Sequence, residues 1–261
     1  MKIVVCAKQV PDTTEVKINP ETNTLVREGV VSIINPFDMY AVEEALRIKE
    51  KLGGTVIILS MGPPQAVESL KELIAMGADE AILLSDRAFA GSDTLATSYA
   101  LAKGIEKIGS VDLILCGKQA IDGDTAQVGP EIAEKLDIPH VTYVKKVNEI
   151  SEKEITVERM NEEGFERVQA PLPALLTVVK EINEPRLPSL KGKMRAKNIQ
   201  IPIWNAEMIG ADPERTGLNG SPTWVKRIFI PELKCQGEIF QGSSEEQVKS
   251  LVDAILSRKI V

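Results

Sequence analysis

The residues most suited to chemistry lie in one short segment, residues 117–130, which reads GKQAIDGDTAQVGP. It follows an apolar run and precedes a helical pattern, and most of its residues are small or polar. It carries two aspartates, Asp122 and Asp124, and Lys118 is its only cation. Such a segment is typical of three structures: a plain strand-to-helix turn, a metal site, or a loop that binds phosphate.

A phosphate site would use the start of the following helix, which we expect near Thr125. The first N–H groups of a helix have no partners inside it and attract anions, and small residues such as Gly123 and Ala126 let a pyrophosphate approach the backbone. Asp122 and Asp124 would repel phosphate, so at least one should bind backbone N–H groups or ribose hydroxyls. Alternatively, the aspartates and Thr125 only cap the helix. The residues alone leave both alternatives open.

Several other kinds of site do not fit the sequence. A calcium loop starting at Asp122 would need an oxygen ligand at its fifth position and a glycine at its sixth, and it has neither. The three cysteines form no C-x-x-C pair, which argues against zinc, iron–sulfur and disulfide frameworks, and we expect Cys6 and Cys116 to be buried. The single histidine, His140, is expected to be structural. The G-x-G-x-x-G and G-x-x-x-x-G-K-[ST] motifs are absent from the sequence.

Charge and hydropathy limit the partners. The formal net charge of −7 does not favour nucleic acid or an anionic membrane surface. No apolar segment approaches the roughly 20 residues that a membrane-spanning helix needs. The opening MKIVVCAKQVPD is interrupted too soon for a signal peptide and reads as a first strand. We therefore expect a cytoplasmic protein.

The first half of the chain alternates apolar runs with helical patterns. Unbroken runs at 3–7, 55–60, 81–85 and 113–117 indicate strands buried on both faces. Amphipathic stretches lie between them, one opened by Asn35 as N-cap and Pro36. This order predicts a doubly wound, mostly parallel α/β sheet of the flavodoxin or Rossmann type. Ligands of such sheets bind beyond the carboxyl ends of the strands. Three segments fall there: 35–38, 61–63 and 117–129.

The second half has a different pattern. Short strands at 141–147, 155–159 and 166–169 and a last apolar run at 174–179 predict a small β-meander beside the parallel sheet. Residues 183–241 are rich in Pro and Gly without clear periodicity, which favours a segment that wraps a partner. A capping box at Ser243 then opens an amphipathic helix. The expected organisation is a nucleotide-binding domain over 1–182, including the 141–179 extension, an arm over 183–242, and a terminal helix over 243–261.

Five short motifs in order resemble one family. They are MKIVVCAKQV at the start, NPFD at 35–38, AMGAD at 75–79, GKQAID at 117–122 and EPR at 184–186. Together they resemble the β subunit of electron-transfer flavoprotein over essentially the whole chain. The resemblance implies pairing with an FAD-carrying α subunit and an adenine-nucleotide site. The residues implied to line it are Cys6, Asn35, Pro36, Phe37, Asp38, Met61, Gly117, Gln119, Ala120, Ile121, Asp122, Gly123, Asp124, Thr125, Ala126, Gln127 and Val128.

The family has two branches with different occupants of this site. In the housekeeping branch the occupant is a structural AMP, and the heterodimer carries electrons from acyl-CoA dehydrogenases. In the electron-bifurcating branch it is a second FAD, which accepts hydride from NADH and divides the electrons between the α-subunit FAD and ferredoxin or flavodoxin. The DGDT loop and residues 86–97 resemble the bifurcating branch. Asp93, Thr94 and Thr97 are then expected to contact flavin or NADH. The structural alternative makes Phe89 and Leu95 core residues and Asp93 a helix cap.

The resemblance also implies partners and places the chemistry on the cofactor. No general acid or base can be named, because hydride and electron transfer belong to the flavin. Leu190 matches the anchor of the family's recognition loop, with Lys191 beside it, and the implied partner is an acyl-CoA dehydrogenase or a quinone reductase. The alternative for Leu190 is an ordinary exposed leucine. A function of another class, a universal-stress-type nucleotide-binding regulatory domain, would be stable without an α subunit.

Overall fold

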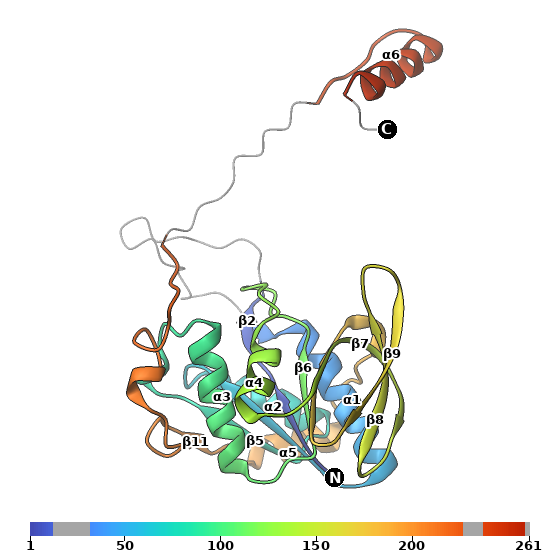
Figure 1. The fold of residues 1–261 in the computed structure, drawn as a ribbon. Coiled ribbons are helices and arrows are strands. Elements are labelled where there is room, and N and C mark those ends of the chain that lie inside the picture. Colours follow the sequence, from blue (N-terminus) through green and yellow to red (C-terminus); the bar gives the residue numbers. More distant parts are fainter. Residues whose placement is uncertain (13–31, 227–236, 259–261) are drawn as a thin grey trace. The chain divides into compact units, whose positions relative to one another are not determined.

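The computed structural model describes residues 1–12, 32–226 and 237–258, and the chain divides into two compact units (Figure 1). The first unit is Met1–Lys226 and the second is Arg227–Val261. Residues 183–226 therefore belong with the α/β unit, whereas the sequence pattern placed them in a separate arm. Each unit is described by itself.

The first unit is built on a nine-stranded sheet of order β11-β5-β4-β1-β6-β10-β7-β8-β9. Every neighbouring pair from β11 to β7 is parallel, whereas β7, β8 and β9 pair antiparallel. The strands are β1 (Lys2–Cys6), β4 (Thr55–Met61), β5 (Glu80–Leu84), β6 (Leu113–Gly117), β7 (His140–Ile150), β8 (Glu154–Met160), β9 (Phe165–Pro171), β10 (Ala174–Val178) and β11 (Ile203–Trp204). A separate antiparallel pair joins β2 (Gln9–Pro11) to β3 (Ser32–Ile34).

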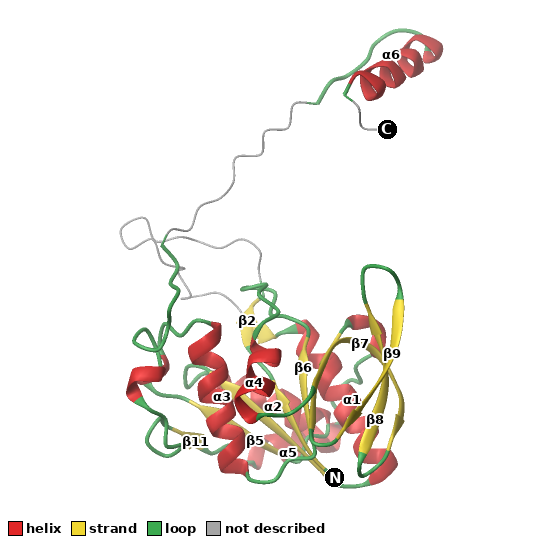
Figure 2. Cartoon of the chain, viewed as in Figure 1, coloured by secondary structure: helices red, strands yellow, loops and turns green. Residues whose placement is uncertain are grey.

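Helices cover both faces of the sheet (Figure 2). On one face lie α1 (Pro36–Leu52), α2 (Ala66–Met76) and α5 (Leu190–Asn198), and on the other lie α3 (Thr94–Ile108) and α4 (Val128–Leu136). Alternate residues of one strand serve the two cores: Val5 packs with the first set of helices and Val4 with the second. Short 3₁₀ turns complete the unit at η1 (Arg87–Phe89), η2 (Lys180–Ile182) and η3 (Pro213–Arg215). The predicted doubly wound α/β fold is confirmed.

Three elements differ from the sequence expectation. The meander β7–β9 continues the main sheet instead of packing beside it, and β10 lies inside the parallel part, between β6 and β7. All five residues of β10 are buried, which suits an interior strand covered on both faces. The stretch expected to be irregular contains α5 and the edge strand β11. Helix α5 escaped detection because Ala196 is its only buried residue, so it has no apolar stripe.

The described part of the second unit centres on α6 (Ser244–Ser257). Ser243 and Glu246 form the predicted capping box, since the Ser243 hydroxyl accepts from the Glu246 N–H and the Glu246 carboxylate accepts from the Ser243 N–H. Among the helices of the described residues, none combines the length and the apolar character needed to span a bilayer.

The topology of the sheet marks one position for a ligand. From β1 the chain proceeds to β4 and β5 on one side, and it then returns to β6 on the other side of β1. This reversal makes the β1/β6 boundary the switch point of the sheet, where open α/β folds bind ligands beyond the carboxyl ends of the strands. Cys6 and Cys116, near those ends, are register partners, and both are buried free thiols.

Candidate nucleotide site

Asn35 joins the start of α1 to the loop that follows β6. It occupies the N-cap position before Pro36, as predicted, but its side chain does not cap the helix. Instead its amide donates to the Gln119 carbonyl (2.8 Å), and its amide oxygen accepts from the Ile121 N–H (3.2 Å). Asn35 is only 1% exposed, so these bonds are shielded from water. The residue thus fixes one end of the 117–127 loop.

Asp38, in the first turn of α1, ties together both strand ends at the switch point. Its carboxylate accepts from the backbone N–H of Lys8 (2.7 Å) after β1 and from that of Gly117 (3.2 Å) at the end of β6. Burial raises the pKa of Asp38 to about 7, although these hydrogen bonds and the charge of Lys8 act in the opposite direction. The side chain therefore changes charge near neutral pH.

The raised pKa of Asp38 predicts how this residue affects stability. The folded pKa lies above the usual value of 3.8, so the folded chain binds the proton more tightly than the unfolded chain. The contribution of Asp38 to the free energy of unfolding therefore falls as pH rises from about 4 to about 7 and is constant above that. Each tenfold difference in proton affinity between the two states corresponds to about 1.4 kcal/mol. Denaturant unfolding at several pH values should show a smaller fall between pH 5 and 8 in Asp38→Asn than in the natural protein. An equal fall in both would contradict this prediction.

Two glycines allow the strands and helices of the site to approach closely. A Cβ on Gly117 would overlap the Asp38 carboxylate and lie 2.7 Å from the Phe37 backbone. A Cβ on Gly129, in the first turn of α4, would lie 2.6 Å from Thr177 on β10. Larger residues at either position would push α1 or α4 away from the sheet. These two glycines therefore allow α1 to pack closely on the end of β6 and α4 to pack closely on β10.

The loop between β6 and α4 is largely exposed, and a turn closed by the Asp124 N–H and the Ala120 carbonyl (2.8 Å) forms its tip. Helix α4 begins at Val128, three residues later than expected, and Gln127 provides no side-chain cap. Asp124 and Ala126 have positive φ values of 53° and 55°, which are uncommon for residues with a Cβ. The helix begins late because these two conformations interrupt helical geometry. Nothing lies within 4 Å of the position that a Cβ on Gly123 would take.

Both aspartates of the loop have polar partners within the chain. Asp122 forms an ion pair with Lys8 (2.7 Å), and Asp124 accepts from the Gln119 side chain. The charge of Asp122 is thus offset by a cation from the end of β1. The electrostatic objection to a phosphate near this loop is correspondingly weaker.

A second segment meets this loop at the start of α4. The Thr94 hydroxyl, at the start of α3, lies 3.1 Å from both the Gln127 and the Glu131 side-chain oxygens. Ser98 donates to the other Glu131 oxygen (3.0 Å). The first turns of α3 and α4 are therefore hydrogen-bonded to each other, and Thr94 and Gln127 are brought together.

Other residues singled out in the sequence lie elsewhere or have structural partners. Asp93 caps α3 through the Ala96 N–H, and its other oxygen accepts from the Thr223 N–H and hydroxyl. Phe89 is buried, whereas Leu95 is 43% exposed. Thr97 lies within α3, and Met61 ends β4 beside the core that contains Cys6 and Cys116. Leu190 and Lys191 begin α5 on the opposite face of the sheet from α3 and α4.

Three residues of the site were not singled out from the sequence. Lys8 was detectable, because it directly follows a predicted strand and so lies at its carboxyl end. Glu131 lies inside a helix and carries no local signal. Tyr143 has a φ of +59° and, together with Phe37, flanks the Lys118 ammonium at 5.2 and 5.8 Å from the ring centres. Among the described residues, no cluster of His, Cys, Asp and Glu side chains could hold a metal ion.

Comparison with known proteins gives the family of the chain. Residues 22–208 match the family model described as electron transfer flavoprotein domain. The electron transfer flavoprotein subunit beta of Thermoanaerobacterium thermosaccharolyticum is 55% identical over 262 residues, which cover 100% of both chains. The chain belongs to the electron transfer flavoprotein family, among its β subunits.

Other members of the family align over nearly their full length. The caffeyl-CoA reductase-Etf complex subunit CarD of Acetobacterium woodii is 55% identical over 263 residues, with 100% of both chains covered. Protein FixA of Azotobacter vinelandii is 47% identical over 264 residues, covering 99% of this chain and 94% of the relative. The family resemblance of the five sequence motifs is thereby confirmed.

Proposed function

We propose that this flavoprotein subunit binds FAD at the β1/β6 switch point and pairs with an FAD-carrying α subunit in an NADH-dependent, electron-bifurcating heterodimer. When bound, the flavin supplies hydride acceptance from NADH and the division of the two electrons between the α-subunit flavin and a low-potential acceptor such as ferredoxin or flavodoxin. The chain itself binds and orients the cofactor. An acyl-CoA dehydrogenase or a quinone reductase is the proposed high-potential partner.

The residues present fit an adenine nucleotide. Gln127 gives α4 no side-chain cap, so phosphate can accept from the N–H groups of Val128 and Gly129, whereas Pro130 has no N–H to offer. The open space at Gly123 allows close approach to the backbone, and Lys8 offsets the charge of Asp122. We assign pyrophosphate binding to the loop at 120–128. Asn35 and Asp38 hold that loop on the sheet.

The contact between Thr94 and Gln127 carries the choice of FAD over AMP. AMP would need only the loop after β6, whereas a dinucleotide is longer and would need a second surface beside it. The start of α3 offers such a surface. Leu95 and Ile121 are 43% and 47% exposed, so each of the two segments presents an apolar side chain to solvent. An isoalloxazine ring is largely apolar and favours such surroundings.

The Thr94 contact gives a test that separates the two nucleotides. With cofactor-stripped αβ complex, Thr94→Val is expected to weaken FAD binding about fivefold, because one hydrogen-bonding group contributes about 1 kcal/mol. AMP binding should change less than about twofold. Calorimetric titration with each nucleotide measures both values. Thr156→Val on β8, the same substitution in the meander, is the control and should change neither. Equal weakening of FAD and AMP would contradict the assignment of α3 to the flavin.

A further inference from the structure

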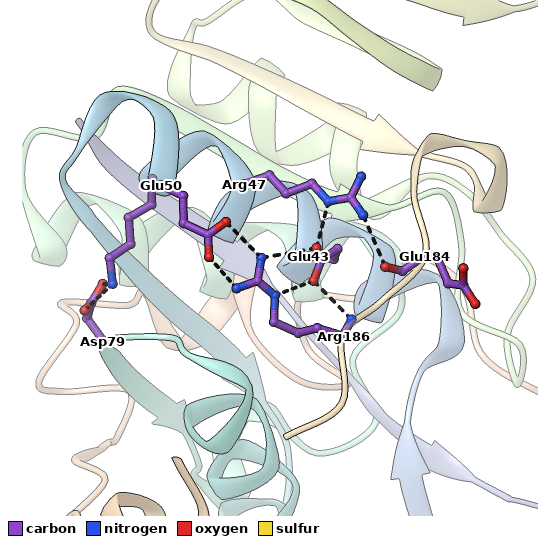
Figure 3. Close-up of polar contacts among 7 residues, drawn as sticks. Glu43, Arg47, Glu50, Asp79, Glu184 and Arg186 are labelled. Carbon is purple, nitrogen blue, oxygen red and sulfur yellow. Dashed lines mark hydrogen bonds and ion pairs between the residues drawn. The ribbon is translucent and has the colours of Figure 1, made fainter. Parts of the chain in front are cut away.

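Residues 183–186 are laid along α1 by a series of polar contacts, and Figure 3 shows those of Glu184 and Arg186. The Asn183 amide donates to the Tyr40 carbonyl and to the Glu44 carboxylate, both at 3.0 Å. One turn further along α1, the Arg47 guanidinium reaches the Glu184 carbonyl (3.4 Å). Two adjacent residues of this segment are thus held on one helix, at positions about one turn apart.

Arg186 forms the strongest of these contacts. Its backbone N–H and Nε donate to one Glu43 oxygen (3.1 and 2.8 Å), and its terminal nitrogens reach the other Glu43 oxygen and the Glu50 carboxylate. Glu43 is 3% exposed. Burial would raise the pKa of Glu43, but hydrogen bonds from Arg186 and Arg47 outweigh it and hold that pKa below its usual range. The guanidinium is therefore clamped between two charged carboxylates, with a geometry that a lysine cannot reproduce.

The chain is anchored again a few residues later, on α5. A Cβ on Gly192 would overlap the Ala75 carbonyl oxygen of α2, so the two helix backbones are in close contact. Arg195 donates to the Ala78 carbonyl (2.9 Å) and to the Asp79 carbonyl. The Asp79 side chain pairs in turn with Lys49 of α1 (2.6 Å). Arg186 therefore contacts α1 directly, and α5 is linked to α1 through Asp79.

Two leucines lie between these anchors. Leu187 directly follows Arg186 and is 89% exposed, and Leu190 begins α5 and is 78% exposed. Ser189 caps α5 by accepting from the Gly192 N–H (2.9 Å), which fixes the turn between the two leucines. The backbone that carries these exposed leucines is held at both ends. A partner that binds the leucines therefore does not have to order the loop first.

We infer that Arg186 is a positioning residue that holds Leu187 and Leu190 preformed for insertion into an apolar pocket of a redox partner. The inference rests on the proposed role of Leu190 in recognition. Lys191, Lys193, Arg195 and Lys197 follow Leu190 along α5 and make this part of the chain positively charged, so the pocket that fits the leucines is edged by carboxylates. Because α1 begins directly after Asn35 and carries Asp38, one helix supports both the partner surface and the cofactor site.

The test uses the αβ complex with an acyl-CoA dehydrogenase as electron-transfer partner. Leu190→Ala is expected to raise the KM for the dehydrogenase about tenfold, as loss of an interface anchor does. Arg186→Lys keeps the positive charge but loses the planar set of N–H donors that holds Glu43 and Glu50, and it should raise that KM about fivefold. Neither should change kcat or reduction by NADH. Arg167→Lys, the same substitution at the exposed ion pair with Glu149, is the control and should leave KM unchanged.

A double-mutant cycle decides whether Arg186 acts through Leu190. In a chain that already carries Leu190→Ala, Arg186→Lys should raise KM by less than about twofold, because the group that it positions is gone. Additive effects would overturn the inference. If Leu190→Ala alone leaves KM unchanged, the proposed recognition role falls and the inference with it. If Leu190→Ala raises KM and Arg186→Lys does not, only the inference fails. If Arg186→Lys does not fold, Glu50→Gln takes its place in the same double-mutant cycle, because it removes only the exposed Arg186–Glu50 ion pair.

Discussion

Gly117→Ala is expected to lower the free energy of unfolding by about 2–3 kcal/mol, the upper range for overpacking a tight interior. The added methyl group would meet the Asp38 carboxylate and the Phe37 backbone at distances that real Cβ atoms do not adopt. The methyl group cannot turn away, so α1 must move from the end of β6. That movement breaks the hydrogen bond from the Gly117 N–H to Asp38 and displaces the loop that follows. Cofactor should therefore be lost together with stability.

Gly123→Ala is the matched control for this prediction. A Cβ at Gly123 has open space around it, and the backbone there does not require a positive φ, so the free energy of unfolding should change by less than about 0.5 kcal/mol. Denaturant unfolding of the two variants measures the difference. If Gly117→Ala were as stable as Gly123→Ala, the close contact between α1 and β6 would not have the role assigned to it.

Asn35→Ala is expected to weaken nucleotide binding about 30-fold while reducing stability by only about 1–2 kcal/mol. The side chain makes two hydrogen bonds to the backbone of the loop, at Gln119 and Ile121, each worth about 1 kcal/mol. Without them the loop is free to leave the position in which α4 and β6 present it. Backbone groups of the exposed loop can form hydrogen bonds with water instead, which limits the loss in the free energy of unfolding. The loss of nucleotide affinity is not limited in this way.

Asn161→Ala tests whether this effect belongs to the site. Asn161 also makes two hydrogen bonds to backbone groups, accepting from the Glu163 and Gly164 N–H groups in the turn between β8 and β9. Asn161→Ala should lower the free energy of unfolding by an amount similar to that of Asn35→Ala and should leave nucleotide affinity unchanged. Calorimetry with the stripped heterodimer compares the two variants. Equal affinity for both would show that Asn35 does not hold the binding loop.

The parallel sheet was predictable because its strands are unbroken apolar runs, a pattern produced by burial on both faces. The runs at 3–7 and 113–117 correspond to β1 and β6, and the helices begin at Pro36 and Thr94, close to their expected starts. Given this alternation, the carboxyl ends of the strands followed as the place for a site. Asn35 and Asp38 at the start of α1 and Gly117 at the end of β6 were all expected at this edge, and they do come together.

What could not be predicted depends on contacts between distant residues. Asn35 has the sequence pattern of a helix cap, yet its side chain bonds a loop 84 residues away, and nothing local distinguishes the two. Asp124 and Ala126 adopt left-handed conformations, for which glycine is the usual sequence signal. Because neither residue is glycine, the sequence did not show that the start of α4 is delayed beyond Thr125. Strand β10 inserts beside β6 through long-range pairing that its own apolar residues do not specify. Helix α5 depends on α2 for its position rather than on its own periodicity.

The most direct test of the central claim is the cofactor content of the purified αβ heterodimer. Nucleotides released by denaturation should be separated and quantified, and the intact complex should be titrated with NADH under anaerobic conditions. The account predicts two FAD and no AMP per heterodimer, with flavin absorbance bleached by NADH. One FAD together with one AMP, and a flavin spectrum unchanged by NADH, would contradict it.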